Sequence, residues 1–252
     1  MSRLIGIVGV PPLAIIEKIN RDGDRIVDLD EPQVRAPIDQ TAAYIPRVYC
    51  AILRTVLLNS LHLPLEHVYI DVGPGKCDCA LHVAGILADL LTVPVTPTRN
   101  QDTRSFGYPL CTSRMPLMEK VSRITKGVQS AAPHAPIPPC QPSCGFWGVP
   151  PRDFALLDLF PETTHVFGWT RCMENKTPAD LELEHVVDPS IPMVFFSQSF
   201  CAKSALAKRL ADRHPRAIAV DCDVTPSSST RAKIEAFLEL SGIVPGRKTR
   251  TP

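Results

Sequence analysis

Cysteine is the residue type with the greatest chemical capacity in this chain. Nine thiols in 252 residues is a high count; they are Cys50, Cys77, Cys79, Cys111, Cys140, Cys144, Cys172, Cys201 and Cys222. An odd number cannot all pair within the chain, and no export signal precedes them, so structural disulfides are not expected. The interpretations that stay open are metal ligands, redox thiols and small buried side chains.

Most of the later cysteines follow runs that are typical of buried strands. The runs and the cysteines behind them are 68–72 with Cys77 and Cys79, 164–167 with Cys172, 193–196 with Cys201, and 217–220 with Cys222. In open α/β sheets, ligands bind beyond the carboxyl ends of the strands. Cys77 and Cys201 also begin predicted helices, where the helix dipole favours the thiolate, the form that binds metal.

A Cys-x3-Cys motif, Cys140 and Cys144, lies just before a predicted strand in the second half. Cys144, Cys172 and Cys201 are spread through that half, and Cys140 offers a fourth thiolate. Dispersed cysteines from successive α/β units can hold a [4Fe-4S] cluster, with an open iron position when only three thiolates bind. The pattern therefore predicts an iron–sulfur cluster on these four residues.

Residues 73–82 carry two further candidate sites. Cys77 and Cys79 are candidate metal ligands, and together with His82 they have a spacing that suits zinc. The preceding turn, Gly73-Pro74-Gly75-Lys76, lacks the spacing of a P-loop but could cradle an anion at the start of a helix. An ordinary tight turn is the simpler interpretation.

The chain also repeats itself. Gly6-Ile7-Val8-Gly9-Val10-Pro11-Pro12 returns as Gly145-Phe146-Trp147-Gly148-Val149-Pro150-Pro151. Each copy leads into an apolar helical stretch and then a strand-like run. This order predicts an α/β fold made of two similar, tandemly duplicated units with mostly parallel sheets. The alternative is two ordinary strand–turn–helix units that share turn chemistry.

The boundaries follow from composition. We expect the first α/β unit at 1–130, a Pro-rich linker at 131–143, the second unit at 144–244, and a disordered basic tail at 245–252. Within the first unit, the pattern predicts one long helix at about 41–61 and a closing helix at about 115–124.

The run Phe195-Phe196-Ser197-Gln198-Ser199-Phe200-Cys201, with the helix and strand that follow, resembles the last lobe of the iron–sulfur subunits of 2-hydroxyacyl-CoA dehydratases and benzoyl-CoA reductases. The resemblance covers about 30 residues. It implies that Cys201 is a cluster ligand and that an ATP-driven activator supplies low-potential electrons. This chain is much shorter than those subunits, and Cys201 is the one ligand that carries over.

Composition excludes other classes. Lys and Arg number 27 and Asp and Glu 26, so the net charge is +1, which predicts neither a nucleic-acid footprint nor a polybasic membrane patch. No run of 18 apolar residues is present, so no membrane span is expected, and a cytoplasmic location is the default.

These patterns together predict an iron–sulfur protein of anaerobic redox metabolism or of cofactor or cluster assembly, with the cluster near the interface of the two units. A redox partner or activator protein would supply electrons, and the sequence leaves oligomer formation open. One alternative is a non-metal α/β enzyme or small-molecule-binding protein with a pocket between the halves. The other is a zinc-binding or scaffold subunit.

Overall fold

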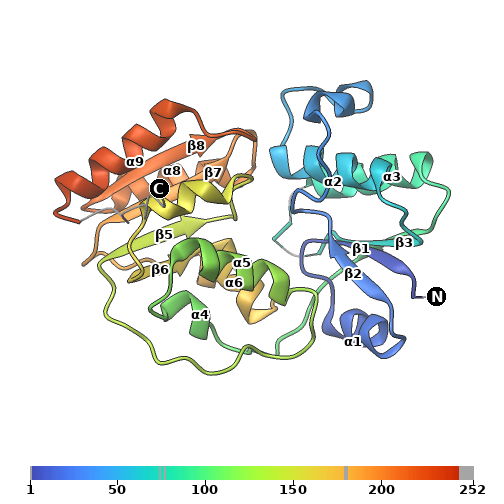
Figure 1. The fold of residues 1–252 in the computed structure, drawn as a ribbon, viewed down its shortest axis with the longest axis horizontal. Helices are drawn as coiled ribbons and strands as arrows, with labels where there is room; N and C mark the ends of the chain where they lie inside the picture. The colour runs from blue at the N-terminus through green and yellow to red at the C-terminus, as the bar shows by residue number, and fades with distance from the viewer. Residues whose placement is uncertain (1, 74, 77, 179–180, 244–252) are drawn as a thin grey trace, which may run out of the picture.

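The computed structural model describes residues 2–73, 75–76, 78–178 and 181–243. It contains two four-stranded sheets in which every strand pair is parallel. Figure 1 shows the two sheets side by side, each with helices packed against it. Both the predicted α/β class and the predicted parallel sheets are confirmed.

The first sheet has the strand order β2-β1-β3-β4. Its strands are β1 (Leu4–Val8), β2 (Arg25–Asp28), β3 (His67–Asp71) and β4 (Val95–Thr98). Its helices are α1 (Leu13–Arg21), the short 3-10 helix η1 (Ile38–Ala43), α2 (Ala51–His62) and α3 (Asp78–Leu90).

The second sheet has the order β6-β5-β7-β8. Its strands are β5 (Cys144–Gly148), β6 (Thr164–Phe167), β7 (Met193–Gln198) and β8 (Ala217–Cys222). The remaining helices are α4 (Pro109–Thr112), α5 (Leu117–Gly127), η2 (Phe154–Leu159), α6 (Trp169–Asn175), α7 (Leu181–His185), α8 (Lys203–Arg213) and α9 (Ser228–Leu240). We call the first sheet with η1 and α1–α3 the first lobe, and the second sheet with η2 and α4–α9 the second lobe.

The two sheets have the same strand order, so β1 and β5 occupy the same position in their sheets. Both strands are fully or nearly fully buried and lead directly into the repeated Gly-Val-Pro-Pro motif. In each sheet the chain first crosses to one side of this strand and then to the other. The order therefore reverses beside β1 and again beside β5, which is where ligands bind in open α/β sheets.

Helices α4 and α5 pack with the second lobe rather than the first. Leu117, Val121 and Ile124 of α5 belong to one buried cluster with Phe146 of β5, and α5 also packs along α6. The predicted boundary at residue 130 assigns these helices to the first unit. Their apolar faces instead cover the second sheet, and a segment without helix or strand, residues 99–108, connects the lobes.

The helix predicted at 41–61 is two separate elements. The 3-10 helix η1 ends at Ala43 and α2 begins at Ala51, with Pro46 between them. Proline lacks the N–H that an α-helix needs and disfavours helical geometry in the residue before it, so the apolar run cannot continue as one helix.

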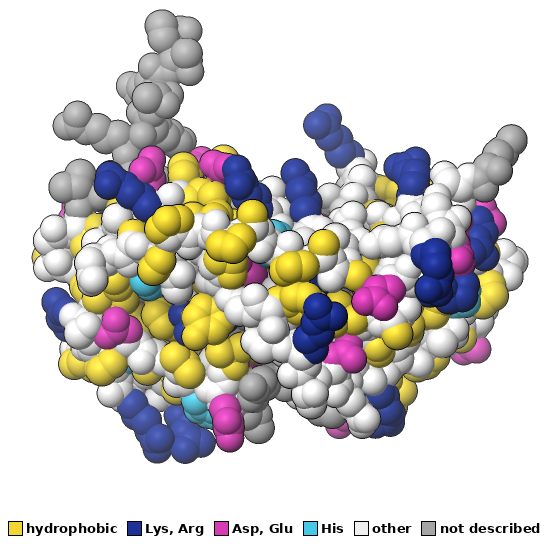
Figure 2. All heavy atoms as spheres, turned by 90° about the horizontal axis from the view of Figure 1, so that it is seen from below, with side chains coloured by type: hydrophobic (Ala, Val, Ile, Leu, Met, Phe, Trp, Pro, Cys, Tyr) yellow, Lys and Arg dark blue, Asp and Glu magenta, His cyan; other side chains and the backbone are white. Residues whose placement is uncertain are grey.

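None of the helices in the described part of the chain is long and apolar enough to cross a bilayer. On the face seen in Figure 2, basic and acidic side chains are interspersed and do not gather into a patch of one sign. This distribution agrees with the near-zero net charge.

Candidate functional site

A cavity of about 310 Å³ lies between the lobes, at the points where both strand orders reverse. From the first lobe it is lined by residues just after β1, β2 and β3, and from the second by residues just after β5 and β7. Its charged side chains are Asp30, Glu31, Asp71, Lys76, Arg152, Glu184 and Lys203. The carboxyl ends of two parallel sheets thus face one space.

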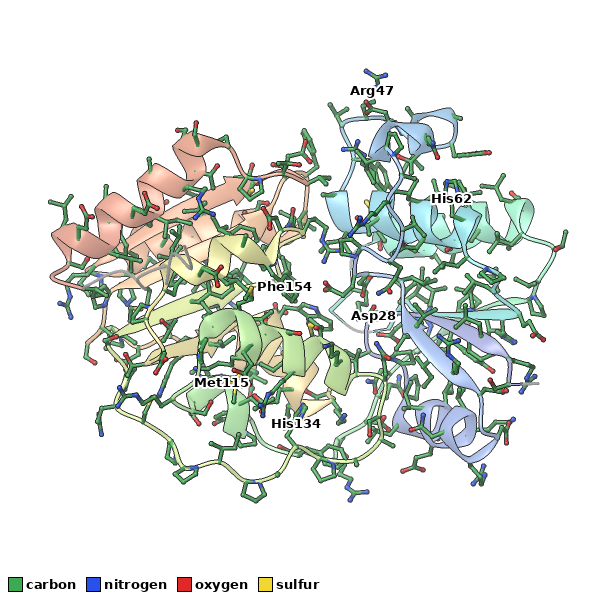
Figure 3. All side chains as sticks on the ribbon, in the orientation of Figure 1. Asp28, Arg47, His62, Met115, His134 and Phe154 are labelled. Carbon is green, nitrogen blue, oxygen red and sulfur yellow. The ribbon has the colours of Figure 1, made fainter. Side chains whose placement is uncertain are left out.

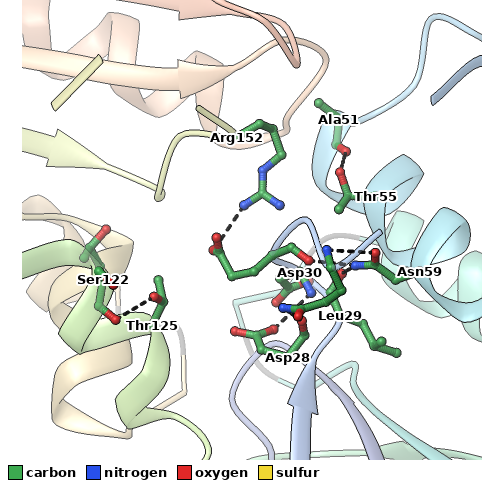
Figure 4. A network of polar contacts seen from close by, with 12 residues as sticks. Asp28, Leu29, Asp30, Ala51, Thr55, Asn59, Ser122, Thr125 and Arg152 are labelled. Atoms are coloured by element: carbon green, nitrogen blue, oxygen red, sulfur yellow. Dashed lines mark hydrogen bonds and ion pairs between the residues drawn. The ribbon is translucent and has the colours of Figure 1, made fainter. Parts of the chain in front are cut away.

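The loop after β2 forms one wall and is held rigidly. Asn59, fully buried on α2, donates its side-chain amide to the Leu29 and Glu31 carbonyls at 2.9 and 2.7 Å. The Asp30 carboxylate accepts the Gly9 amide at 2.7 Å. Figure 4 shows this network from close by, and Figure 3 places Asp28 on the side of the first lobe that faces the second. These bonds fix the acidic side chains of the loop at the cavity.

Arg152 crosses from the second lobe to this acidic loop (Figure 4). Its guanidinium donates from Nη2 to Glu31 Oε1 at 3.3 Å, and its side chain is only 1% exposed. Burial raises the pKa of Glu31, whereas the nearby Arg152 charge acts in the opposite direction. Arg152 Nε and Nη1 are buried and have no hydrogen-bond partner in the described part of the chain.

Asp71 and Lys76 face each other at the end of β3, with Nζ and Oδ2 3.9 Å apart. Asp71 Oδ1 accepts hydrogen bonds from the Asn100 amide at 2.8 Å and the Thr98 hydroxyl at 3.3 Å, while Oδ2 has no hydrogen-bond partner among the described residues. Burial raises the pKa of Asp71 and lowers the pKa of Lys76. Burial therefore shifts both groups toward their neutral forms.

The Lys76 ammonium also approaches β1 closely. A Cβ built on Gly9 would lie 2.7 Å from Lys76 Nζ, and Gly9 has φ +74°. Glycine is needed here both for the left-handed backbone and for the close approach of the lysine.

Trp169, the first residue of α6, is the aromatic wall of the cavity. Lys76 Nζ lies 3.8 Å from the centroid of its ring, and Lys203 Nζ lies 5.6 Å away. Lys203 also donates to the buried Glu184 at 2.5 Å. The second oxygen of that carboxylate, Oε2, is buried and has no partner in the described structure.

Cys201 lines the cavity between β7 and α8 and is half-buried. The residue before it, Phe200, has φ +62°, a conformation that costs roughly 1–3 kcal/mol for a residue other than glycine. Such strain clusters at functional loops, because the surrounding structure must hold it in place. Cys50, on the first lobe, lines the same cavity.

The predicted cluster ligands are distributed over several environments. Cys144 and Cys172 are fully buried in one hydrophobic cluster, which is built mainly from the second lobe and includes Ile7 and Val10 of the first. The Cys144 thiol lies 3.1 Å from Thr164 Oγ1. Cys140 lies 3.7 Å from His165 Nε2. Cys201 packs instead against the buried cluster of the first lobe. Burial raises the pKa of Cys144 to about 11.

Of the two remaining candidate ligands, Cys79 is half-buried against the first-lobe cluster, and Cys77 lies outside the described residues. His82, suggested as their partner, is exposed on α3. Within the described ranges, no group of three or more Cys, His, Asp or Glu side chains is arranged to hold a metal ion. The cluster prediction therefore gains no geometric support and stays a prediction.

The sequence signalled part of this site. Lys76 belongs to the turn considered above as an anion cradle, and Cys201 was predicted at a strand end. Arg152, Glu31, Asp71 and Glu184 were missed. Two sequence positions could have pointed to these residues. Asp71 is the last residue of a buried strand, and Arg152 directly follows Pro150-Pro151.

Comparison with known proteins adds little. No protein-family model matches the chain, and no curated protein matches it. Among solved structures, MenH from S. aureus aligns over 96% of this chain and 94% of its own, with 11% sequence identity and a TM-score of 0.21. At this score the likeness carries no argument.

Proposed function

We propose that this protein is an enzyme that binds a small organic acid in the cavity between the lobes and transfers a proton to or from it. The observation that carries the proposal is the cavity itself, at the facing reversal points of two parallel sheets, with buried charged groups from both lobes. This proposal develops the sequence-based alternative of an α/β enzyme with a pocket between its halves.

Arg152 supports the binding of an anion. Among the described residues its buried Nε and Nη1 have no hydrogen-bond partner, and leaving such donors unpaired costs roughly 1–3 kcal/mol each. A carboxylate oxygen would satisfy them with charge-assisted hydrogen bonds. Trp169 offers an apolar face for the rest of a small ligand.

The Asp71–Lys76 pair supports proton transfer. Groups whose neutral and charged forms are brought closer in free energy exchange protons more readily near neutral pH. Burial shifts the pKa values of Asp71 and Lys76 toward neutral pH, and Asp71 Oδ2 accepts no hydrogen bond from the described residues. The Cys201 thiol, supplied by the other lobe, offers a second proton-transfer group.

The test is solvent-proton exchange. The protein is incubated in D2O with lactate, malate, alanine or aspartate, and the proton on the carbon next to the carboxylate is followed by NMR. We expect loss of that signal for at least one compound, and a rate at least ~100-fold lower in Lys76→Gln, because a positioned acid or base contributes about that factor or more. Lys18→Gln is the matched control, since Lys18 is an exposed lysine on α1.

Two further outcomes separate anion binding from proton transfer. Binding of a panel acid without any exchange would keep the anion site and refute the proton transfer. Absence of both would refute the proposal. Cys201→Ser and Cys77→Ser belong in the same assay, because the sequence puts these two cysteines at corresponding places of the repeat and Cys77 directly follows Lys76.

We also propose that the two sheet-forming halves arose by tandem duplication. The shared strand order and the repeated Gly-Val-Pro-Pro motif support this.

The iron–sulfur cluster stays a second proposal, supported by the burial of Cys144 and Cys172 in the same hydrophobic core. Protein purified without oxygen should then be brown and lose iron on Cys172→Ala substitution. Colourless, iron-free protein after reconstitution would refute it.

A further inference from the structure

Two thiols from different lobes meet at the cavity. Cys50 is the residue before α2 in the first lobe, and Cys201 lies between β7 and α8 in the second. Both line the cavity, and Cys201 packs against the buried first-lobe cluster that contains Cys50. Among the effects on the pKa of the Cys50 thiol, the largest comes from Cys201, so the two side chains lie near each other. Residues far apart in sequence are therefore adjacent in the fold.

The two thiols differ in their access to solvent. Cys50 is only 6% exposed, whereas Cys201 is half-buried at the cavity wall. The hydrogen bond with Cys201, followed by burial, raises the pKa of the Cys50 thiol far above its ordinary value. A reagent in the cavity would reach Cys201 first, and Cys50 is positioned to react with the product.

We propose that Cys50 and Cys201 form an oxidative modification site, at which peroxide converts the two thiols into a disulfide that links the lobes. The Cys201 thiolate attacks one peroxide oxygen, the O–O bond breaks, and hydroxide leaves to become water, which gives a sulfenic acid. Cys50 sulfur then attacks the Cys201 sulfur and the S–O bond breaks. The released hydroxide takes the Cys50 proton and forms a second water, so the sum is two thiols plus hydrogen peroxide to one disulfide plus two waters.

The link would remove the Cys201 thiol from the cavity and tie α2 to the loop before α8. Both effects oppose ligand binding and proton transfer at the proposed site. A dithiol reductant returns both thiols by exchange, so the modification is reversible. The formation of the link does not depend on the proposed function and is measured separately from it.

Trypsin gives a direct readout. Cys50 is the one cysteine of peptide 48–54, and Cys201 is the one cysteine of peptide 177–203. Reduced protein is treated with increasing hydrogen peroxide, quenched with N-ethylmaleimide, digested without reductant and analysed by mass spectrometry. We expect the linked pair 48–54/177–203 to be the first disulfide formed and to disappear after dithiothreitol.

Variants separate this pairing from general oxidation. Cys50→Ser and Cys50→Ala should abolish the linked peptide and leave Cys201 as a sulfenic acid that dimedone captures. Cys79→Ser is the matched control, because Cys79 is also half-buried against the first-lobe cluster, and it should form the link like the wild type. Circular dichroism confirms that each variant is folded.

Three results would overturn the proposal. In the first, Cys201 pairs first with another cysteine, such as Cys77. In the second, both thiols stay reduced while the remaining cysteines oxidise. In the third, the folded Cys50 variants form no Cys201 sulfenic acid that dimedone captures. If the link forms but no panel acid exchanges protons, the modification site stands and the proposed function fails.

Discussion

Replacing Arg152 with Met should separate the stability of the lobe interface from ligand binding. Arg152 and Glu31 form an ion pair between the lobes, with side chains 1% and 15% exposed. Met keeps much of the apolar volume and removes the charge, which leaves the Glu31 carboxylate buried without this partner. Removing one member of a buried pair costs about 3–5 kcal/mol. For a chain of this size, 3 kcal/mol corresponds to a fall in Tm of roughly 6–12 °C.

The stability lost in Arg152→Met should grow as pH rises. Burial already raises the folded-state pKa of Glu31, and removing the arginine takes away a favourable charge. The folded variant then holds a proton on Glu31 at pH values where the unfolded chain, with a pKa near about 4.3, has lost it. The variant's own stability therefore falls as pH rises above about 4.3. The wild type has a smaller rise in the pKa of Glu31 and loses less stability, so the deficit of the variant is smaller at pH 5 than at pH 8.

Urea unfolding followed by circular dichroism, over a pH series, measures both effects. The double variant Glu31→Gln/Arg152→Met should regain most of the lost stability, because no unpaired charge is left. It should still bind the anionic ligand about 10- to 150-fold more weakly than Glu31→Gln alone, since charge-assisted hydrogen bonds contribute about 1.5–3 kcal/mol. A double variant as unstable as Arg152→Met, or a deficit that does not change with pH, would refute the electrostatic explanation.

Two further predictions concern the interior. Burial, followed by the charges of Asp30 and Glu31, raises the pKa of Asp28 well above its ordinary value, so the wild type loses stability as pH rises from about 4. Asp28→Asn should therefore unfold at a higher urea concentration than the wild type at pH 7 and at the same concentration near pH 4. The exposed control Asp212→Asn should show no such difference, and a destabilised Asp28→Asn at pH 7 would contradict this explanation. Gly148→Ala should cost roughly 3 kcal/mol or more, because its Cβ would lie 2.2 Å from the Phe196 carbonyl oxygen and Gly148 has φ +148°. Gly85→Ala, in open space on α3, should instead stabilise the protein by about 0.5–1 kcal/mol. Thermal unfolding of the two glycine variants decides this, and equal effects would refute the steric argument.

The strands were predictable because they are short buried apolar runs bounded by glycine, proline or charged residues. The predicted runs at 68–72, 164–167 and 193–196 differ by no more than two residues from β3, β6 and β7 at either end. The helix across Pro46 was wrong because apolar content was allowed to outweigh the missing N–H of proline. The fold of each lobe is encoded locally, which is why sequence patterns reached it.

The site was harder to predict because no local pattern specifies which side chains face the other lobe. Cys172 and Cys201 both follow strand ends, yet Cys172, within α6, points into the core, whereas Cys201 lines the cavity. The pairing of Arg152 with Glu31 depends on how the lobes dock. That ligands bind beyond the carboxyl ends of parallel strands predicts the edge of the sheet where a site lies. It does not predict the direction in which each side chain points.

The position of the lobes should therefore control the chemistry of the cavity. Arg152 contacts Glu31, Arg54 of α2 lies 3.8 Å from Asp223 beyond β8, and Lys76 lies on the ring of Trp169, so each of these charged contacts spans the two lobes. An acid that bridges Arg152 and Lys76 would interact with both walls and favour the arrangement in which they are close. By the same linkage, any change that separates the lobes should weaken ligand binding and return the pKa values of Asp71 and Lys76 toward their ordinary range, because water would enter beside them. Affinity and proton transfer would thus be lost together when the lobes part.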